Sequence, residues 1–514
     1  MSDTKNNSYD VLIVGCGPVG ATLANLLRES GHSVAIFDRD KEIFHAPRAM
    51  MFDPESCRLY QRMGILDRMY PDDAKPFHTF RIVNHKRKIL VEMDYSKVPD
   101  VFGHAGVGTM FHQPTLERLL REDFEKGTKV DSFLGYEVLS VSSGADQATL
   151  KAKNIDTGEE TEFTGQYIVG SDGGASMCRR SIGAKRIDFN YHRKWIVMDV
   201  AVHDQAYWDA QEDFSEFMCQ PNAARVFVKG MHNHYRFDFE IDEELADQFT
   251  HDDAIAHISD YIDTSSVEIQ RCAPYNFYAG MPDIWRKDRI LLAGDAAHQT
   301  SPFAGQGLNM GLRDAAHLGY LFDLIFDGKA DDRILDTYHE ERWPHCKKVI
   351  NIASKTGSSL STTNRWEQIK RNFGFWLVKM FPKLGRVANT EDYFPAYTGG
   401  LIGTGHDLCG RRLNQPEVVD ASGQRKLLDD VIGDGFVLLL SDQEEGDAIS
   451  WFKQEFGGSV FVIGKDFQDV DGKLTEFTGG SAVLVRPDRY IFGANESGNA
   501  LCASFQEHLR QYQS

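Results

Sequence analysis

The amino-acid sequence predicts an α/β fold in which a parallel-sheet domain carries an inserted, mainly antiparallel sheet and is followed by a smaller α/β domain. Three observations support this fold class. A strand, a glycine-rich turn, a helix and a second strand follow one another in residues 11–38. Residues from about 190 to 285 alternate apolar and polar side chains, as antiparallel strands with one covered face do. Beyond Leu413, short apolar runs alternate with helix-like segments.

Composition and charge narrow the class of protein. Apolar residues make up 42% and charged residues 26% of the 514 residues, as in ordinary globular proteins of about three domains. The net charge of −20 repels phosphate, so we expect no nucleic-acid partner. No apolar run reaches the ~18 residues of a membrane span, and the N-terminus has no apolar signal core. Eight scattered cysteines without a Cys-x-x-Cys pair favour a reducing, cytoplasmic location.

The first element is the apolar run of residues 11–14, which is typical of a strand that is buried on both faces. A glycine-rich turn, residues 15–20, leads into a helix over residues 21–30 whose leucines recur at helical spacing. Gly31 ends this helix, and residues 33–37 form a second apolar strand that ends at Asp38. This strand–turn–helix–strand unit is the setting in which a Gly-x-Gly-x-x-Gly motif binds a dinucleotide.

Each residue of the turn has its own physical task. Gly15 allows the tight turn, Gly17 lets a pyrophosphate approach the backbone, and Gly20 lets the helix pack closely on the strand. The helix N-terminus offers N–H groups to the anion. Asp38 would accept from ribose hydroxyls and repel a 2′-phosphate, which indicates FAD or NAD rather than NADP. A glycine-rich turn without a ligand is the alternative. The predicted contacts here are Gly15, Gly17, Pro18, Val19, Gly20, Asp38 and Arg39.

A second segment decides in favour of FAD. A buried strand at 289–293 runs into Gly294-Asp295, and the loop from Pro302 to Asn309 opens a helix over about 308–326. A carboxylate there could bind the ribityl polyol, and a helix N-terminus would stabilise negative charge on a reduced flavin. A third segment, residues 167–179, is a strand that ends in Asp172-Gly173.

These three segments, in this order, resemble the class A flavoprotein aromatic hydroxylases of the p-hydroxybenzoate hydroxylase fold, over roughly residues 8–385. The resemblance therefore implies a Rossmann-like FAD-binding domain. It places Gly15, Gly17, Gly20 and Asp38 on FAD, Asp172 and Gly173 on FAD and the reduced nicotinamide, Gly294 and Asp295 on the ribityl chain, Pro302, Gly305, Gly307, Leu308 and Asn309 around the flavin ring, Arg48 near the flavin, and Gln113 on the flavin side chain.

Within that family the chain is most similar to the three-domain phenolic hydroxylases. Residues 48–55 resemble their Arg-Ala-x-x-x-Asp-x-Glu stretch, and the tail with residues 410–412 and 484–488 resembles their thioredoxin-like third domain. The expected domains are residues 1–188 with 285–398 for FAD, 189–284 for the substrate sheet and 399–514 for the thioredoxin-like part. Because the tail has no Cys-x-x-Cys, we expect it to serve packing or dimerisation rather than redox chemistry.

The resemblance implies an NADPH- or NADH-dependent, FAD-containing monooxygenase. In such enzymes O₂ adds at the flavin C4a position, and the resulting hydroperoxide transfers OH to a phenolic ring. Phenolate reacts better than phenol, so an acceptor near the phenol and a dry pocket are required. The sequence has no second dinucleotide motif, as expected for a reductant that binds transiently. A homodimer is also compatible with the resemblance.

The predicted catalytic residues are Asp53, Tyr235 and Pro302, with Asp53 as the first candidate for phenol activation. The alternative for Asp53 is a helix cap, because it precedes Pro54 and a helical run. Strand alternation places Tyr235 and Arg236 on opposite faces of the sheet. His234 lies on the same face as Arg236 and is the alternative to Tyr235 as the substrate contact. His298 is expected to be structural, near the cofactor. Arg48 could bind flavin, a substrate carboxylate or neither.

Two other interpretations remain. A protein of the same fold could act on a non-phenolic substrate by epoxidation or ring opening, whereas the absence of a Trp-x-Trp-x-Ile-Pro segment argues against a halogenase. A flavin-binding protein without hydroxylase activity is the other interpretation. His and Cys show no metal-ligand spacing, so no metal site is predicted. Residues 331–385 are predicted to be helical, and the aromatic stretch from Trp366 to Phe381 is predicted to pack on its own domain rather than on a membrane.

Overall fold

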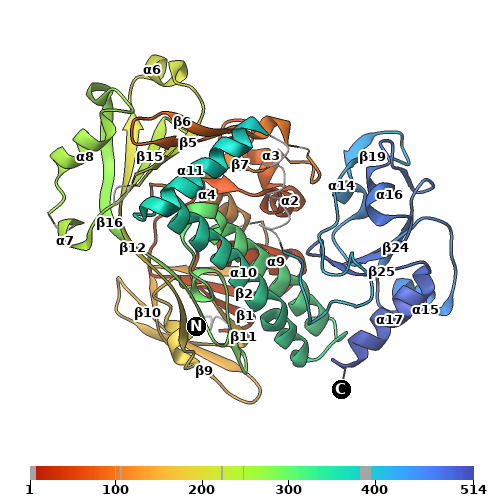
Figure 1. Ribbon diagram of the computed structural model, residues 1–514. Helices are drawn as coiled ribbons and strands as arrows, with labels where there is room; N and C mark the ends of the chain where they lie inside the picture. Colours follow the sequence, from red (N-terminus) through yellow and green to blue (C-terminus); the bar gives the residue numbers. More distant parts are fainter. Residues whose placement is uncertain are drawn as a thin grey trace.

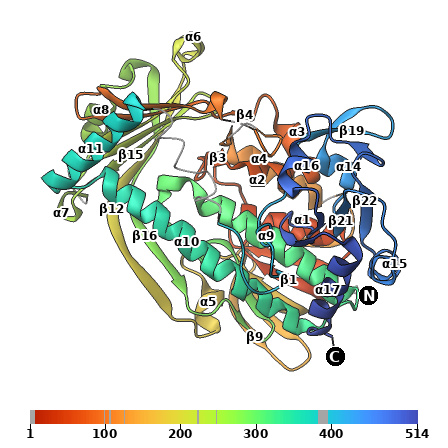
Figure 2. The same cartoon turned by 45° about the vertical axis from the view of Figure 1, so that its right-hand side comes forward.

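The computed structural model describes residues 7–98, 100–104, 107–124, 126–220, 224–246, 248–381 and 395–513. Figure 1 shows three parts along the chain. A parallel-sheet part around β1 and α9 lies between a second sheet, with β12, β15 and β16, and the blue C-terminal part. The turned view in Figure 2 keeps this order.

The first sheet has the strand order β17-β18-β11-β1-β2-β8, with β10 and β9 added beside β11. Its strands are β1 (Ser8–Val14), β2 (Val34–Asp38), β8 (Val130–Leu134), β9 (Tyr136–Ser143), β10 (Ala148–Asn154), β11 (Glu160–Gly170), β17 (Arg286–Lys287) and β18 (Ile290–Leu292). The four strands β18, β11, β1 and β2 run parallel, and β8 continues them. Because β1, β2 and β18 are buried on both faces, they are the continuous apolar runs that the sequence shows.

Helices pack on this sheet and connect its strands. They are α1 (Pro18–Glu29), α2 (Pro54–Arg62), α3 (Ile65–Met69), α4 (Gln113–Phe124), α5 (Met177–Ser181), α9 (Gln306–Phe326) and α10 (Asp336–Leu360). Two 3-10 turns, η3 (Gly294–Ala296) and η4 (Pro302–Ala304), lie between β18 and α9. A small sheet of β3 (Met51–Phe52), β4 (Ala74–Pro76) and β7 (Thr109–Phe111) has β7 at its centre.

The second sheet has the order β16-β12-β15-β14-β13-β5-β6. Its strands are β5 (Thr79–Asn84), β6 (Ile89–Asp94), β12 (Arg186–Val202), β13 (Ser215–Cys219), β14 (Arg225–Lys229), β15 (His234–Glu240) and β16 (Val267–Pro282). All neighbouring pairs are antiparallel except β13 with β5, so the sheet is mainly antiparallel, as predicted. It extends beyond the predicted segment 189–284, because β5 and β6 come from residues 79–94.

The two faces of this sheet differ. Its outer face packs apolar side chains against α8 (His251–Ile258), near the short helices α6 (Gln205–Ala210) and α7 (Glu243–Ala246). Helix α11 (Arg365–Met380) lies over β6 (Figure 1). Helix α11 packs on β6 and α10, with Phe375 in an apolar cluster, as predicted, whereas Trp366, Phe373 and Trp376 are 51–73% exposed. Residues 382–385 of the predicted helical region lie outside the described residues.

The C-terminal part contains two small sheets, β20-β19-β23 and β22-β21-β24-β25. Its strands are β19 (Glu417–Asp420), β20 (Arg425–Leu427), β21 (Val437–Leu440), β22 (Ser459–Val462), β23 (Phe467–Gln468), β24 (Ala482–Val485) and β25 (Ile491–Asn495). Its helices are α14 (Leu428–Ile432), α15 (Asp447–Gln454), α16 (Lys473–Thr478) and α17 (Gly498–Arg510). β21 pairs parallel with β22 and antiparallel with β24. The predicted mixture of strands and helices is present, and the thioredoxin-like arrangement stays a prediction.

Buried charges join the C-terminal part to the rest of the chain. Arg58 of α2 donates to both carboxylate oxygens of Asp429 at 2.9 and 2.8 Å, and both side chains are buried. Arg486 forms an ion pair with Glu341 of α10 at 2.7 Å. Removing one partner of such a pair would leave a buried charge unpaired and cost about 3–5 kcal/mol. None of the described helices is both long and apolar enough to cross a bilayer.

Candidate functional site

The fold brings the three predicted motif segments together. The glycine turn follows β1, the Asp172-Gly173 turn follows β11 and Gly294-Asp295 follows β18, and these strands are parallel neighbours in the order β18-β11-β1. Ser171 N donates to the carbonyl oxygen of Val14 at 2.8 Å, and Ala293 N to that of Gly170 at 2.9 Å. The carboxyl ends of neighbouring parallel strands form the crevice in which α/β folds bind ligands.

The glycine turn is close-packed where the fold needs it and open where a ligand would lie. A Cβ on Gly15 would collide with the carbonyl oxygen of Ser171, and φ at Gly15 is +104°. A Cβ on Gly20 would collide with the carbonyl oxygen of Gly15. By contrast, a Cβ on Gly17 would meet nothing within 4 Å. Gly17 is the N-cap of α1, and the first N–H groups of a helix have no acceptor inside it.

Asp38 lies at the end of β2 and braces this turn. Its Oδ2 accepts from the backbone N–H of Cys16 at 2.8 Å, and its Oδ1 from that of Asp40 at 2.9 Å. Arg39 forms an ion pair with Asp40 at 3.7 Å and its side chain is 75% exposed. Each Asp38 oxygen already accepts one backbone hydrogen bond, so the predicted ribose contact would be an additional hydrogen bond to the same carboxylate.

Asp172 has one oxygen in use and one available. Its Oδ2 accepts from the N–H groups of Met177 and Cys178 at 2.6 and 3.0 Å and so fixes the start of α5. Its Oδ1 is buried and accepts from no N–H or O–H group among the described residues, and the Cys178 thiol interacts with this carboxylate. A thiol is a weak donor, so the oxygen can still accept from a stronger donor such as a ribose hydroxyl.

Asp295 lies in η3, directly after the carboxyl end of β18. Its side chain is exposed to solvent. The surrounding protein raises its pKa, and His298 and Arg48 oppose that rise. Among the described residues no hydrogen bond to the carboxylate of Asp295 is found, which leaves both oxygens available to a polyol.

Buried charged side chains hold the loop that carries Asp295. Asp314 of α9 accepts from Gly294 N at 2.9 Å, from His298 Nε2 at 2.6 Å and from Arg342 Nε at 2.8 Å. Burial alone would raise the pKa of Asp314, but His298 and Arg342 outweigh it and keep the pKa low. His298 therefore has the structural position that we predicted for it. Asp314 and Arg342 were missed, because nothing in the local sequence links them to the loop.

The loop before α9 presents a turn and a helix N-terminus. Pro302 is exposed in η4, and Gly305 has φ +61° as the N-cap of α9. Gly307 and Leu308 lie in the first turn, whose N–H groups point out of the helix end. Asn309 is turned away: its Oδ1 accepts from Asp53 N at 3.1 Å, and its Nδ2 donates to the carbonyl oxygen of Gly305 at 2.8 Å. Asn309 therefore shapes the predicted ring-binding turn from behind.

Arg48 and Gln113 form a second support. Gln113 Oε1 accepts from the backbone N–H groups of Arg48 and Ala49 at 2.8 and 2.7 Å, and Gln113 Nε2 donates to Glu117 at 2.7 Å. Gln113 thus holds the segment that carries Arg48. The Arg48 side chain is exposed and its charge lowers the pKa of Asp295, and its contact with the flavin stays a prediction.

The structure places Asp53 as a helix cap. Its Oδ1 accepts from Ser56 N at 2.9 Å at the start of α2, and its Oδ2 forms an ion pair with Arg313. The side chain is 1% exposed. Both oxygens are engaged and away from solvent, so Asp53 is not positioned to accept a phenol proton. This corrects the prediction that Asp53 activates the phenol and selects the capping alternative.

Tyr235 is also displaced from the predicted role. It lies on the outer face of the second sheet, where its ring contacts Trp208 and Phe227 at centroid distances of 4.9 and 5.2 Å. Strand alternation was predicted correctly, but the face was chosen wrongly because alternation does not tell which face is inward. His234 and Arg236 occupy the inner face, and Arg236 Nη1 donates to the carbonyl oxygen of Arg48 at 2.6 Å.

The inner face carries a buried cluster of charges. Asp199 of β12 lies 3.0 Å from His234 Nε2 and 3.4 Å from Arg236 Nε, and it pairs with Arg271 of β16. Burial would raise the pKa of Asp199, but His234, Arg236 and Arg271 hold it below its usual value. Burial raises the pKa of the neighbouring Asp238 to about 6, against the opposing effect of Arg236. No local motif marks this cluster.

The raised pKa of Asp238 makes stability depend on pH. Because the folded state disfavours ionised Asp238, the wild type loses stability as pH rises from about 4 through 6. Asp238→Asn removes this loss. The stability of Asp238→Asn relative to wild type should therefore rise by roughly 3 kcal/mol between pH 4 and pH 8. Urea denaturation of both proteins at the two pH values checks this. An equal difference at both pH values would show that Asp238 does not titrate in this range.

A methionine cluster lies between this face and the loop before α9. Met50, Met110 and Met231 are buried and pack with Met51 and Val228. Met51 Cε lies 3.2 Å from where a Cβ on Gly305 would stand. Gly230 is in contact with Met50, and His234 Nδ1 lies 3.3 Å from the Cβ position of Gly230. Pliable apolar side chains thus connect the predicted ring-binding turn with His234.

The residues fit an FAD. The open space beside Gly17 suits a pyrophosphate, Asp172 Oδ1 and Asp295 are available acceptors, and the α9 N-terminus lies beside Pro302. The cradle was predictable from local sequence. The supports behind it, Asp314, Gln113 and Asn309 among them, depend on long-range contacts.

Comparisons with known proteins agree with this geometry. The family described as FAD binding domain matches residues 8–353, and the one described as HcaD C-terminal domain matches residues 410–508. A 3-(3-hydroxy-phenyl)propionate/3-hydroxycinnamic acid hydroxylase of Escherichia coli is 30% identical over 84% of this chain and 78% of its own. A probable NADH-specific resorcinol 4-hydroxylase of Rhodococcus jostii is 29% identical over 95% of this chain and 92% of its own.

Solved structures share the fold over nearly the whole chain. The flavin-dependent monooxygenase PieE, in complex with FAD and substrate, has a TM-score of 0.84 at 21% identity and covers 98% of this chain and 99% of its own. Aklavinone-11 hydroxylase, with FAD and aklavinone, has a TM-score of 0.81 at 21% identity, with 99% and 100% covered. At this identity the likeness concerns the fold alone, and it confirms the predicted fold class.

Proposed function

Because the chain belongs to the FAD-binding-domain family, which matches it over residues 8–353, we propose that it is an NAD(P)H-dependent FAD monooxygenase that hydroxylates a phenolic ring. One observation of the structure carries the proposal. Three turns at the ends of adjacent parallel strands carry Gly17, Asp172 and Asp295, with open space at Gly17 and with Asp172 Oδ1 lacking an N–H or O–H donor among the described residues. A glycine turn without a ligand would not require these acceptors.

When bound, FAD would supply electron transfer from the nicotinamide and delivery of one atom of O₂ to the aromatic ring. The backbone at Gly17 and the α1 N-terminus would hold the pyrophosphate, and Asp295 would accept from the ribityl hydroxyls. Arg48, held by Gln113, places a positive charge near Asp295. The α9 N-terminus at Gly307 and Leu308 favours negative charge beside the loop that holds Pro302.

His234, not Asp53 or Tyr235, is our candidate for contact with the substrate phenol. It is 5% exposed on the inner sheet face, with Asp199 at 3.0 Å from Nε2. Neither ring nitrogen of His234 makes a hydrogen bond of good geometry among the described residues, and Nδ1 lies near Gly230, which adjoins Met50. An imidazole that lies beside a carboxylate and is bordered by apolar side chains can accept a phenol proton where water is excluded.

Replacing His234 with glutamine is expected to lower kcat by ~100-fold, the usual range for loss of a general base, with a smaller change in KM. The loss should shrink for phenols with a more acidic hydroxyl, because these need less help to ionise. Tyr235→Phe is the matched control, since its ring packs on the opposite face, and it should keep near-normal turnover. A loss that is the same for acidic and ordinary phenols would contradict the role of His234.

The enzymatic assignment is tested by oxidation of NADH and NADPH by the FAD-loaded protein. We would add resorcinol and 3-(3-hydroxyphenyl)propionate, which the names of the relatives suggest. We would also add non-phenolic analogues, which test the alternative of epoxidation or ring opening. At least one phenol should accelerate oxidation of the reduced nucleotide more than tenfold. Its product should carry one atom of ¹⁸O from ¹⁸O₂. Stimulation by non-phenols alone would favour epoxidation or ring opening, and no stimulation of a flavin-loaded protein would favour a flavin-binding role.

The charge balance on the inner sheet face bears on the substrate. Arg236 and Arg271 are already matched by Asp199 and Asp238, so this cluster offers little spare positive charge for a substrate carboxylate. Arg48 is the exposed cation nearby. We also propose that the protein acts in the cytoplasm as a homodimer, and that the C-terminal domain from about residue 399 braces α2 and α10 through Arg58 and Arg486.

A further inference from the structure

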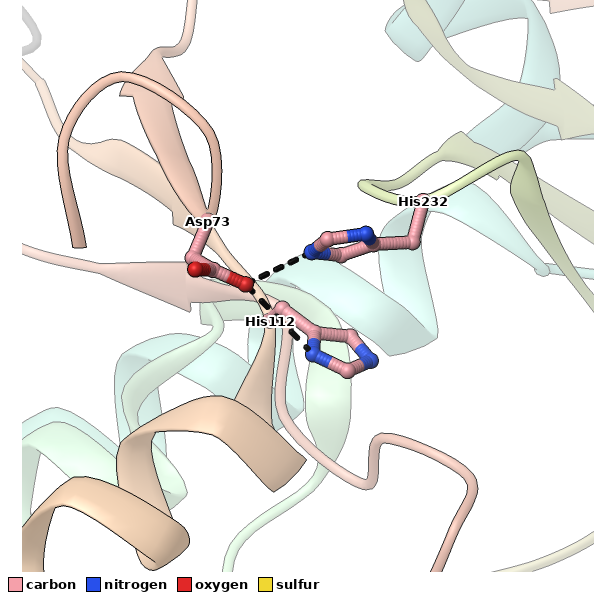
Figure 3. A group of neighbouring side chains, drawn as sticks. All are labelled: Asp73, His112 and His232. Carbon is pink, nitrogen blue, oxygen red and sulfur yellow. Dashed lines mark hydrogen bonds and ion pairs between the residues drawn. The ribbon is translucent and has the colours of Figure 1, made fainter.

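Asp73, His112 and His232 come from three separate segments and point toward one another (Figure 3). Asp73 lies between α3 and β4, His112 between β7 and α4, and His232 in the turn between β14 and β15. Asp73 and His232 are 159 residues apart in the chain, so their spacing gave no signal of a site. The first two belong to the FAD-binding part and the third to the second sheet. None of them contributes to the flavin crevice.

The three side chains share one small volume. His232 Nε2 lies 2.6 Å from Asp73 Oδ1, and His112 Nδ1 lies 3.9 Å from the same oxygen. One nitrogen or oxygen atom from each side chain lies within 4.8 Å of the others. A tetrahedral ion with bonds of about 2.0–2.1 Å holds its ligand atoms about 3.3 Å apart. The observed separations lie on both sides of that value, so small side-chain rotations would complete the geometry.

Two of the three ligands are already fixed. His112 N donates to the carbonyl oxygen of Asp73 at 2.9 Å, which ties the two segments at their backbones. The Thr115 hydroxyl donates to Asp73 Oδ1 at 2.6 Å and lies 2.9 Å from His112 Nδ1. An ion bound through Asp73 Oδ1 and His112 Nδ1 would displace the Thr115 hydroxyl from these two atoms, while the backbone hydrogen bond keeps both side chains in place. His232 is 46% exposed, so the remaining coordination positions open to solvent.

We propose that Asp73, His112 and His232 bind a divalent transition-metal cation of the zinc class. Two imidazoles and one carboxylate suit Zn²⁺, whereas Mg²⁺ and Ca²⁺ prefer oxygen ligands. A bound ion clamps the β14–β15 turn of the second sheet to the loop before α4. The turn also carries Met231 and leads into His234, so the clamp fixes one edge of the methionine cluster. The proposal does not depend on the flavin chemistry.

An ordinary His–Asp ion pair is the alternative, and the chain offers an internal control for it. His192 Nε2 lies 2.7 Å from Asp188 Oδ2 on the exposed surface, and within the described part of the chain no third potential metal ligand lies beside this pair. The pair resembles that of His232 and Asp73 but lacks a second imidazole. If Zn²⁺ binding needs three ligands, the site with His232 and Asp73 should bind the ion and the pair of His192 and Asp188 should not.

The test is a titration of the holoenzyme with ZnCl₂ in competition with a chromophoric chelator. The wild type should bind one Zn²⁺ per chain, and His232→Ala and Asp73→Asn should each weaken binding by at least tenfold. His192→Ala should bind as the wild type does. Because His232 lies in an exposed turn, His232→Ala should fold normally, which circular dichroism and retained FAD verify.

Thermal unfolding gives a second measurement. Zn²⁺ should raise the Tm of wild type and of His192→Ala but not of His232→Ala, because an ion that binds the folded state alone stabilises it. Failure of wild type to bind Zn²⁺ at 100 µM would overturn the proposal, as would unchanged binding by His232→Ala. Neither result would affect the flavin-dependent activity, so the two proposals fail separately.

Discussion

Gly17→Ala is expected to abolish FAD binding while the apoprotein stays folded. The φ and ψ angles at Gly17, −75° and 179°, are ones that alanine adopts without strain, and its Cβ would meet no protein atom within 4 Å. The same open space is where a pyrophosphate must approach the backbone. The methyl group should therefore weaken FAD binding by ~100-fold or more, about 2.7 kcal/mol. Titration of the apoprotein with FAD, followed by flavin fluorescence, measures the loss.

Two other glycines give the controls. Gly374→Ala adds a methyl group to α11 where nothing lies within 4 Å, far from the crevice, and should leave FAD binding unchanged. Gly20→Ala should instead fail to fold properly, since its Cβ collides with the backbone of Gly15. If Gly17→Ala retained tight FAD binding, the pyrophosphate would not lie on this turn, and the proposed cofactor site would be wrong.

Asp314→Asn is expected to be the most destabilising single change behind the crevice. Asp314 is fully buried and accepts from Gly294 N, His298 and Arg342. Asparagine keeps the size but removes the charge, which leaves buried Arg342 without its carboxylate partner. Losing one member of a buried ion pair costs about 3–5 kcal/mol. Because the folded-state pKa of Asp314 is lowered, its contribution is present at neutral pH and is lost as pH falls through that pKa.

Urea denaturation at pH 7.5 measures this effect, and Asp323→Asn is the control. Asp323 lies on the same helix, pairs with His32 at 2.9 Å and is one-third exposed, so its loss should cost less than about 1 kcal/mol. Asp314→Asn should also weaken FAD retention, because Gly294 N loses a charged acceptor. Equal stability of the two variants would show that the Asp314–Arg342 pair is not needed to hold the loop.

The cofactor cradle was predictable because its chemistry is local. A glycine motif lies within six residues, and its strand and helix are written in the neighbouring hydrophobic pattern. The carboxylates Asp172 and Asp295 follow buried strands, and the carboxyl ends of parallel strands meet at one edge. Gly15 and Gly20 are enclosed, as their predicted packing tasks require, and Gly17 faces open space, while its contact with a pyrophosphate stays a prediction.

The substrate side was not predictable to the same extent. Asp53 has the spacing from Arg48 that the resemblance requires, but its carboxylate forms an ion pair with Arg313, which is 260 residues away in the chain. Tyr235 and His234 were correctly assigned to opposite faces, yet the choice of face depends on what packs there, and Trp208 and Phe227 cover Tyr235. The exposed aromatic residues of α11 show the same limit, because helical periodicity does not reveal how much partner surface is available.

The sequence by itself therefore determined the fold class, the dinucleotide turn and the acidic residues that follow parallel strands, because each depends on neighbours within one or two elements. Only the tertiary structure decided which charges are free. The side chains of Asp53, Asn309 and Gln113 form hydrogen bonds within the protein. Asp172 Oδ1 and Asp295 remain able to accept hydrogen bonds from a ligand. The tertiary structure also brought together Asp73, His112 and His232. Hydrogen bonds and ion pairs act over a few ångströms in space, so residues far apart in sequence settle whether a polar side chain holds the fold or meets a ligand.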